Sequence, residues 1–488
     1  MTNLFPPLPE TKAPPSGIII ERVRPEIDGG RYPIKRVMGD VLQVSADIFK
    51  DSHDKIAAVL QYRRRADAEW QEAEMHLVDN DRWAGEFLLP NNTRYVYTIA
   101  AFPDRWATWC DEVAKKHGAG QDVALELIEG SLILEEALGR AAGADRDVLE
   151  AAIATAGGAA SQAAKVQHLL GDDVAFAMQR ARSRAGEARY AHELEVTVDR
   201  SAARFAAWYE FFPRSAGTNP TRGATLTEAA QRLPAIAAMG FDVAYLTPIH
   251  PIGSAFRKGK NNTLHPEPGD PGVPYAIGSE EGGHDAIEPG LGTLEDFQGF
   301  VAAAASLGME VALDIALQAS PDHPWAKEHP EWFSVRPDGT IRYAENPPKK
   351  YQDIYPINFE TPAWRELWQE MRRILIFWVE QGVKTFRVDN PHTKSMAFWE
   401  WVIASVQAEH PDVIFLSEAF TRPKVMKLLA KAGFTQSYTY FTWRNFKREL
   451  EEYFIELTQS EMKEYYRGNL FPNTHDILPF ILQEGGRP

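Results

Sequence analysis

Residues 385–394 read Thr385-Phe-Arg-Val-Asp-Asn-Pro-His-Thr-Lys394, a short apolar and aromatic run that ends on an acid and a turn. Apolar residues recur at helical spacing on both sides, over Trp364–Glu380 and over Ser395–Glu409. The order helix, strand, helix is typical of a parallel sheet whose crossover connections are helices. Because Asn-Pro follows it directly, Asp389 is predicted to lie at the carboxyl end of its strand.

The same alternation extends in both directions, from about residue 204 to the end of the chain. Strands are predicted over Phe205–Phe212, Val243–Pro248, Glu310–Leu317, Lys384–Asp389, Val413–Glu418, Ser437–Tyr440 and around Leu470–Asn473. Helices are predicted over Thr225–Met239, Thr293–Ser306, Trp364–Glu380, Ser395–Glu409, Pro423–Ala430 and Phe446–Tyr466. This pattern predicts an α/β fold, a TIM-type (β/α)8 barrel over residues 204–488. No eighth strand precedes Pro488, so we expect an incomplete barrel from a longer protein.

The first 203 residues follow other patterns. Residues 1–115 show short alternating segments such as Arg94-Tyr-Val-Tyr-Thr-Ile99, separated by polar turns, which predicts an N-terminal β-sandwich. Residues 116–190 are rich in Ala and Glu, with an apolar stripe at helical spacing, and predict a helix bundle. Residues 191–203 alternate again, so the bundle is predicted to be an insertion into the sandwich.

Composition and charge exclude several classes of protein. The 488 residues include 52 Lys and Arg against 68 Asp and Glu, a net charge of −16, whereas nucleic acids and anionic membranes attract basic surfaces. The single cysteine, Cys110, allows no internal disulfide, which is typical of a reducing compartment. Met1–Gly17 is rich in proline and lacks the pattern of a secretory signal, so we expect a cytoplasmic location.

Three acidic residues follow predicted strands directly. Asp389 ends the fourth strand, Glu418 ends the fifth, and Asp476 follows the seventh. A single acid there is often only a solvated rim residue, but three at the active face of a barrel indicate chemistry. A carboxylate nucleophile with a carboxylic acid as proton donor is the arrangement used in retaining glycosyl transfer. Arg387 shares a strand face with Asp389 and is predicted to keep that carboxylate ionised.

Two long loops, 249–292 and 318–360, are predicted on the same face as the acids. They carry the basic segments Phe256-Arg-Lys-Gly-Lys-Asn261 and Asn346-Pro-Pro-Lys-Lys-Tyr351. These cations either form a solvated loop surface or, in a chain of net charge −16, indicate an anionic substrate. The histidines lack zinc-ligand spacing and no phosphate-binding glycine loop is present, so neither metal nor cofactor is predicted.

The chain resembles the alpha-amylase superfamily of retaining barrel enzymes. Four short motifs carry the resemblance, in order: Val311-Ala-Leu-Asp314, Phe386-Arg-Val-Asp389, Phe415-Leu-Ser-Glu418 and Asn473-Thr-His-Asp476. Within the superfamily it is similar to the α-1,4-glucan:maltose-1-phosphate maltosyltransferases. The strings that point to this family include Pro248-Ile-His-Pro-Ile-Gly253, Glu281-Gly-Gly-His-Asp-Ala-Ile287, Ser320-Pro-Asp-His-Pro-Trp325 and Arg387-Val-Asp-Asn-Pro-His-Thr-Lys394.

The resemblance implies roles for particular residues. Asp389 corresponds to the nucleophile, Glu418 to the general acid/base and Asp476 to the stabiliser of the transition state. The residues that correspond to the binding site for maltose 1-phosphate are Lys258, Gln318, Asp353 and Asn390, with Lys260 and Lys350 as further candidates and Lys260 as the alternative to Lys258. Gln318-Ala-Ser stands where many amylases have an Asn-His beside calcium, so no calcium is expected.

The resemblance also implies the substrates and the assembly. The donor is α-maltose 1-phosphate and the acceptor is an α-1,4-glucan. The assembly is a homodimer that needs no cofactor, and family members have a further C-terminal β domain. Two other functions remain open at this point. One is an α-glucan hydrolase of the same superfamily, which the basic loops disfavour because a neutral glucan does not need them. The other is an inactive truncated fragment, which the missing strand favours and the three acids disfavour.

Overall fold

A computed structural model describes residues 16–485, in two compact units. Of the described residues, the first unit contains 16–31, 39–89 and 94–196, and the second contains 32–38, 90–93 and 197–485. Most of the proline-rich stretch for which no secretory signal is predicted, residues 1–15, lies outside the described residues. Among the residues described, no helix is both long and apolar enough to cross a membrane.

An antiparallel sheet forms the body of the first unit. Its strands are β1 (Ile18–Arg24), β3 (Val41–Lys50), β4 (Ile56–Arg64), β5 (Gln71–Asp79), β6 (Arg82–Leu88), β7 (Arg94–Pro103) and β9 (Leu194–Asp199), paired in the order β1-β3-β6-β5-β4-β7-β9, with the short β8 (Ala188–Arg189) beside β7. Asn80 and Asp81 connect β5 to β6 with φ of 42° and 64°. Two left-handed residues in a two-residue loop suit the twist of a hairpin.

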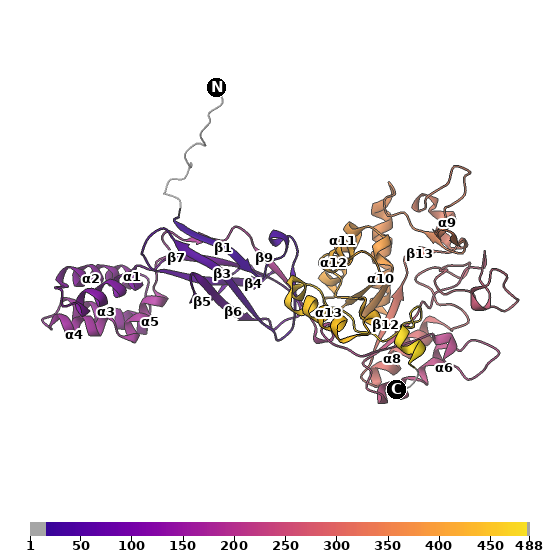
Figure 1. The fold of residues 1–488 in the computed structure, drawn as a ribbon, viewed down its shortest axis with the longest axis horizontal. Helices are drawn as coiled ribbons and strands as arrows, with labels where there is room; N and C mark the ends of the chain where they lie inside the picture. Colours follow the sequence, from indigo (N-terminus) through magenta and orange to yellow (C-terminus); the bar gives the residue numbers. More distant parts are fainter. Residues whose placement is uncertain (1–15, 486–488) are drawn as a thin grey trace, which may run out of the picture. The chain divides into compact units, whose positions relative to one another are not determined.

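Five helices are inserted between β7 and β8. They are α1 (Arg105–Gly118), α2 (Ala124–Leu138), α3 (Ala144–Gly157), α4 (Gln162–Leu169) and α5 (Asp172–Arg180), and they gather apart from the strands in Figure 1. They enclose a core of their own, in which Trp109 packs against α2. Gly130 allows this approach, because a Cβ atom there would lie 2.5 Å from the Trp109 ring. The first helix begins 11 residues before the predicted start at 116, because Asp104 caps it.

The second unit is built on a parallel sheet. Its strands are β10 (Trp208–Phe211), β11 (Val243–Leu246), β12 (Glu310–Ile315), β17 (Thr385–Asp389), β18 (Ile414–Glu418) and β19 (Gln436–Ser437), in that order. The helices between them are α6 (Leu226–Ala230), α7 (Leu233–Ala238), α8 (Leu294–Ser306), α10 (Trp364–Glu380), α11 (Met396–Glu409) and α12 (Pro423–Lys431). Figure 1 shows α10, α11 and α12 beside the strands. Six of the predicted strands are therefore confirmed.

The predicted seventh strand is wrong in its position and extent. Only a single bridge, from Ser437 to Gly468, continues the sheet, and residues 470–473 form no strand. Pro472 has no N–H to donate to a neighbour, and its carbonyl accepts a hydrogen bond of 2.7 Å from the Thr442 hydroxyl instead. The described strands therefore form an open six-stranded parallel sheet, which is followed by the helices α13 (Lys447–Gln459) and α14 (Phe480–Glu484).

The two predicted long loops carry small elements of their own. These are β13 (Gln318–Ala319) paired with β16 (Tyr355–Pro356), α9 (Pro324–Glu328), and a hairpin of β14 (Ala344–Asn346) and β15 (Lys349–Tyr351). His284 and His323 lie buried beneath them, 3.2 Å apart, with the His284 Nε2 bonded to the Ala316 carbonyl. Burial lowers the pKa of His284 to about 4 and that of His323 to about 2, so both rings are neutral core residues at pH 7.

A short segment from the N-terminal third of the chain also belongs to the second unit. Strand β2 (Ile34–Val37) places the buried Lys35 ammonium 2.7 Å from the Ala430 carbonyl, and it also bonds to the Phe434 carbonyl. Next to it, Arg36 pairs with Glu464 at 2.5 Å. These contacts attach residues 32–38 to the end of α12 and to the segment after α13.

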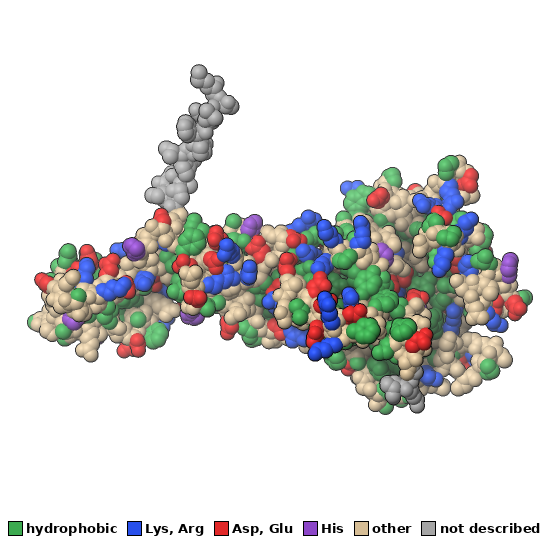
Figure 2. Space-filling view, in the orientation of Figure 1, with side chains coloured by type: hydrophobic (Ala, Val, Ile, Leu, Met, Phe, Trp, Pro, Cys, Tyr) green, Lys and Arg blue, Asp and Glu red, His purple; other side chains and the backbone are tan. Residues whose placement is uncertain are grey.

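The surface carries charges of both signs. Figure 2 shows Lys and Arg side chains interspersed with Asp and Glu side chains over the face in view. The acidic excess of the sequence is therefore not gathered into one patch on that face.

Candidate active site

The first two predicted acids face each other at the ends of neighbouring strands. Asp389 ends β17 and Glu418 ends β18, and the two residues are partners in the parallel register. Each is only 7% exposed. Two carboxylates at the carboxyl ends of parallel strands, side by side and largely removed from water, form the centre of the candidate site.

The Arg387 guanidinium contacts both of these carboxylates. Its side chain is 1% exposed, and one terminal nitrogen lies 3.0 Å from Asp389 and 3.1 Å from Asp314 on β12. The other terminal nitrogen lies 3.5 Å from Glu418. One guanidinium thus contacts three buried acids, which would otherwise repel one another.

Asp314 is further fixed by two tyrosines. The hydroxyls of Tyr245 on β11 and Tyr275 in the loop after it each donate to the same oxygen of Asp314, both at 2.7 Å. Burial raises the pKa of both hydroxyls, so they remain donors at neutral pH. Asp314 is 0% exposed and bound by Arg387 and both tyrosines, so it is a positioning residue for Arg387.

Glu418 has the protonation behaviour of a general acid/base. Burial raises the pKa of Glu418 to about 7, with Arg387 opposing this shift and the charge of Asp389 adding to it. The backbone N–H of Asn390 also donates to its carboxylate at 3.1 Å. A carboxyl group that is half protonated near pH 7 can both give and take a proton under ordinary conditions.

The third predicted acid, Asp476, is bound to a histidine rather than to Arg387. Its carboxylate lies 3.1 Å from Nε2 of His475, which is also 2.9 Å from the Tyr275 hydroxyl, and Nδ1 of the same ring bonds to Glu210 on β10. Burial alone lowers the pKa of His475, but hydrogen bonds to Asp476 and Glu210 outweigh it and raise the pKa to about 10. The imidazolium in turn lowers the pKa of Asp476.

Replacing Glu210 tests this histidine pair. We expect Glu210→Gln to lower the pKa of His475 by at least about one unit, because one of its two anionic partners is removed. NMR titration of the imidazole measures this, and Glu210→Asp, which keeps the charge, is the matched control. In the unchanged protein the pairing stabilises the fold fully below the ordinary pKa of 6.5, and this contribution is lost as pH rises toward about 10. An unchanged titration in Glu210→Gln would contradict the assignment.

The predicted substrate-binding residues fall into two groups. Gln318 and Asn390 adjoin the acids: Gln318 donates to the Tyr275 carbonyl at 3.1 Å, and Asn390 has left-handed backbone geometry with φ of 43°. Lys258 and Asp353 form a buried pair at 3.9 Å, and the Asp353 oxygen that faces Lys258 has no hydrogen-bond partner within the described part of the chain. That unpartnered oxygen leaves the pair with capacity for a further polar group.

The two alternative lysines lie in more open positions. The side chain of Lys260 is 77% exposed and lies 3.9 Å from Asp270, and Lys350 is exposed on β15. Among the described residues, neither lysine forms an ion pair with Asp314, Asp389 or Glu418, which together with Asp476 are called the acid cluster below. Lys394, in contrast, donates to the Asn390 carbonyl at 3.3 Å and is a cation beside the acids. Within residues 16–485, no group of three His, Cys, Asp or Glu side chains is arranged to hold a metal ion.

Relatives match this chain over nearly its whole length. The alpha-1,4-glucan:maltose-1-phosphate maltosyltransferase of Myxococcus xanthus (strain DK1622) is 53% identical over 478 residues, which cover 96% of this chain and 72% of that protein. The chain belongs to the alpha-1,4-glucan:maltose-1-phosphate maltosyltransferase family. The maltosyltransferase of Chlorobaculum tepidum is 50% identical over 470 residues, covering 96% of this chain and 70% of that protein. The family predicted from the motifs is thus confirmed.

Two further comparisons concern parts of this maltosyltransferase-family chain. The family model described as alpha-1,4-glucan:maltose-1-phosphate maltosyltransferase, domain N/S, matches residues 16–200. Among solved structures, an alpha-amylase from Lactobacillus plantarum is 27% identical with a TM-score of 0.43, over 52% of this chain and 60% of that one.

Sequence reasoning misses several residues of the site. Asp314 belongs to the motif Val311-Ala-Leu-Asp314, but no function is predicted for it. No function is predicted for Tyr245, Tyr275 or Glu210 either. Asp314 could have been found, because it is an acid inside an otherwise apolar predicted strand, Glu310–Leu317, and ends one of the quoted motifs. Tyr275 and Glu210 carry no such signal, since they lie 39 and 265 residues from the partners that they bind.

Proposed function

We propose that this enzyme transfers maltosyl units from α-maltose 1-phosphate to the non-reducing end of α-1,4-glucans and releases phosphate, with net retention of configuration. The observation that carries this proposal is the pair Asp389 and Glu418, in register at the ends of β17 and β18 and joined by one buried arginine. Relatives about half identical to this chain bear the name of that reaction.

The first step forms a covalent intermediate. The carboxylate of Asp389 attacks the anomeric carbon of the maltosyl group, and the bond from that carbon to the phosphate oxygen breaks. The electron pair of the broken bond leaves with the phosphate. Arg387, at 3.0 Å, keeps Asp389 charged and therefore nucleophilic.

The second step transfers the maltosyl group. Glu418, as carboxylate, takes the proton of the 4-hydroxyl of the acceptor glucan while that oxygen attacks the anomeric carbon. The bond to Asp389 breaks, and its carboxylate is restored. Each step inverts the anomeric carbon, so the product keeps the α configuration.

The remaining predicted residues have supporting roles in this proposal. Asp476, held by His475, stabilises positive charge at the anomeric carbon in the transition state. Lys258, Gln318, Asp353 and Asn390 bind the donor, with Lys260 and Lys350 as further cations for its phosphate. The buried Lys258–Asp353 pair, the bond of Gln318 to the Tyr275 carbonyl and the bond of the Asn390 N–H to Glu418 support this assignment.

We also propose the finer architecture. The six parallel strands belong to an incomplete (β/α)8 barrel over residues 204–488, and the antiparallel strands of residues 1–115 and 191–203 form a β-sandwich interrupted by the helices. The strand β5 supports the sandwich, because its first half pairs with β4 and its second half with β6, as in a strand that switches sheets. A homodimer and a cytoplasmic location follow from the family resemblance and from the single cysteine; sedimentation analysis tests the former.

The transfer is tested by mixing the protein with maltose 1-phosphate and maltohexaose. We expect phosphate release together with glucan products that grow by two glucose units at a time. Release of reducing sugar from the glucan without any use of the phosphate donor would contradict the proposal and identify a glucan hydrolase. A longer protein that continues past Pro488 is the control for an inactive fragment. If neither protein releases phosphate from maltose 1-phosphate, the proposed donor is wrong.

A further inference from the structure

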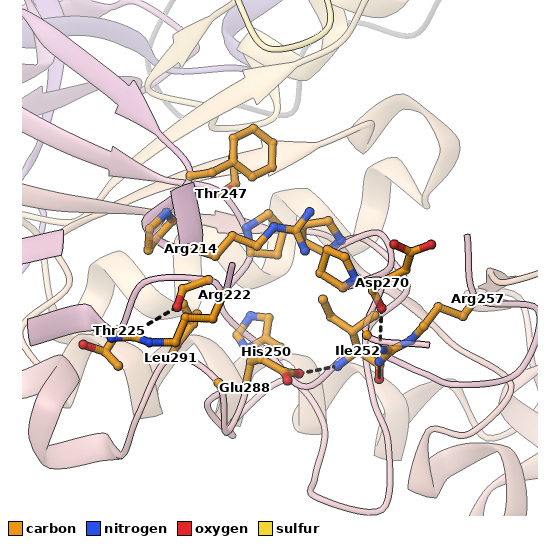
Figure 3. Close-up of a pocket in the computed structure, with 18 residues that line it drawn as sticks. Arg214, Arg222, Thr225, Thr247, His250, Ile252, Arg257, Asp270, Glu288 and Leu291 are labelled. Atoms are coloured by element: carbon orange, nitrogen blue, oxygen red, sulfur yellow. Dashed lines mark hydrogen bonds between the residues drawn. The ribbon is translucent and has the colours of Figure 1, made fainter. Parts of the chain in front are cut away.

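A cavity in the second unit is lined by none of the residues assigned to the candidate active site. It has a volume of about 490 Å³ and is lined by the segments that follow β10 and β11, together with residues from the loop between β11 and α8. Figure 3 shows Arg214, His250 and Glu288 around one space, with Arg257 and Asp270 on one side and Arg222 and Thr225 on the other. A cavity of this size suits a small organic ligand.

One donor and one acceptor of this cavity have unused hydrogen-bonding capacity. The Arg214 guanidinium gives a single hydrogen bond, of 3.2 Å, to the Gly272 carbonyl. One carboxylate oxygen of Glu288 accepts from the Ile252 N–H at 2.9 Å, and the other has no hydrogen-bond partner in the described part of the chain. A ligand with neighbouring hydroxyl groups fits such a wall. One hydroxyl can accept a hydrogen bond from the guanidinium, and another can donate one to the carboxylate.

Two buried side chains of the lining are incompletely bonded. Thr247 and His250 are each 1% exposed, and among residues 16–485 the Thr247 hydroxyl and Nε2 of His250 have no hydrogen-bond partner. Nδ1 of His250 lies 3.2 Å from the Ala286 carbonyl and must donate to it, so Nε2 of the neutral ring is an acceptor. Buried polar atoms are normally satisfied, and an acceptor requires a ligand that brings a donor, such as a hydroxyl.

Two of the three arginines that line the cavity already make several hydrogen bonds within the protein, which argues against an anion. Arg222 forms a two-bond pair with Glu228, at 2.8 and 2.7 Å. The Arg257 guanidinium donates to three backbone carbonyls of its own loop. With Glu288 and Asp270 also in the lining, a phosphate would meet two carboxylates together with its cations. A neutral ligand meets no such repulsion.

The rest of the wall is apolar. It consists of rings and aliphatic side chains, those of Phe212, Pro213, Pro248, Pro271, Pro274 and Leu291. Such surfaces pack against the C–H faces of a sugar ring while its hydroxyls reach polar groups. The Phe212 ring also meets His475 edge-on, with centroids 5.8 Å apart, so a sugar in the cavity would lie next to the acid cluster.

From these observations we propose that this cavity is a second binding site for carbohydrate, which takes a neutral glucosyl unit of an α-glucan through Arg214, Glu288 and Thr247. The proposal rests on the proposed function for its choice of sugar. Its test uses binding in the absence of any phosphate donor, so a negative result here leaves the transfer assay unaffected, and the reverse also holds.

Calorimetric titration with maltotriose tests the site. We expect a Lys258→Ala/Asp353→Ala variant, changed in the predicted donor site, to retain maltotriose binding. Adding Arg214→Gln should weaken that binding about tenfold, because a charged hydrogen bond is lost. Arg222→Gln, whose guanidinium is already paired, is the matched control and should leave the affinity unchanged. Equal affinity with and without Arg214→Gln, or no binding in the first variant, would overturn the proposal.

A second measurement does not depend on the folding of variants. Crystals of the unmodified protein soaked in maltotriose should show a sugar ring between Arg214 and Glu288. Water alone in the cavity would overturn the proposal. So would displacement of the sugar by inorganic phosphate at this position, which would identify an anion site instead.

Discussion

Asp389→Ala is expected to reduce phosphate release from maltose 1-phosphate by about 10⁵-fold, the largest effect of any single change in this chain. The carboxylate of Asp389 is the proposed nucleophile, and no neighbouring group can replace it. Asp314 is bound by Arg387 and two tyrosines, and Glu418 lies on the adjacent strand with a pKa near 7. Steady-state phosphate release measures the effect.

Asp389→Asn is the matched control for folding in this experiment. It keeps the shape and the hydrogen-bond acceptor toward Arg387 while removing the charge, so it should be equally inactive and melt near the temperature of the unchanged protein. Activity within tenfold of the unchanged protein in either variant would exclude Asp389 as nucleophile.

Glu418→Gln is expected to separate the two half-reactions. Phosphate is a good leaving group and needs little protonation, so the first step should continue and give one burst of phosphate per enzyme. Transfer to the acceptor needs a base, and its loss should slow the steady state by about 10²–10⁴-fold. Rapid-mixing kinetics with intact-protein mass spectrometry should show a maltosyl group accumulating on Asp389.

The pH dependence provides a second test of Glu418. Because burial raises the pKa of Glu418 to about 7, the carboxylate needed as base forms as the pH rises through that value. The acceptor-dependent rate should therefore increase with pH from about 6 to 8 in the unchanged protein. This rise should vanish in Glu418→Gln. A rise that persists in the variant would assign the titration to another group.

The sequence allows the parallel strands to be predicted because each is a short apolar run that ends on a turn. The acids at the ends of β17 and β18 could be predicted for the same reason, since strand ends in a parallel sheet converge. The predicted strand around 470–473 fails because apolar content alone does not show that Pro472 interrupts the pairing. Alternation likewise shows that residues 18–103 are strands, but not which strands are neighbours.

The charge network of the site is less accessible from sequence. That Arg387 serves Asp389 follows from their spacing of two along a strand. That it also contacts Asp314 and Glu418 depends on the register of three strands, which local patterns do not determine. The pairing of Glu210 on β10 with His475 joins residues 265 positions apart, which only the tertiary structure brings together.

The attachment of residues 32–38 to the second unit has a consequence for how such proteins can diversify. The Lys35 ammonium caps carbonyls at the end of α12, and Arg467 pairs with Asp199 at 2.6 Å and bonds to the Arg36 carbonyl. A single recombination event near residue 200 would join the second unit to a foreign N-terminal segment and remove the Lys35 contacts with the end of α12. Shuffling of the two units between genes therefore requires at least two crossovers, and exchange of the helical insertion alone, between β7 and β8, is the simpler route to variety.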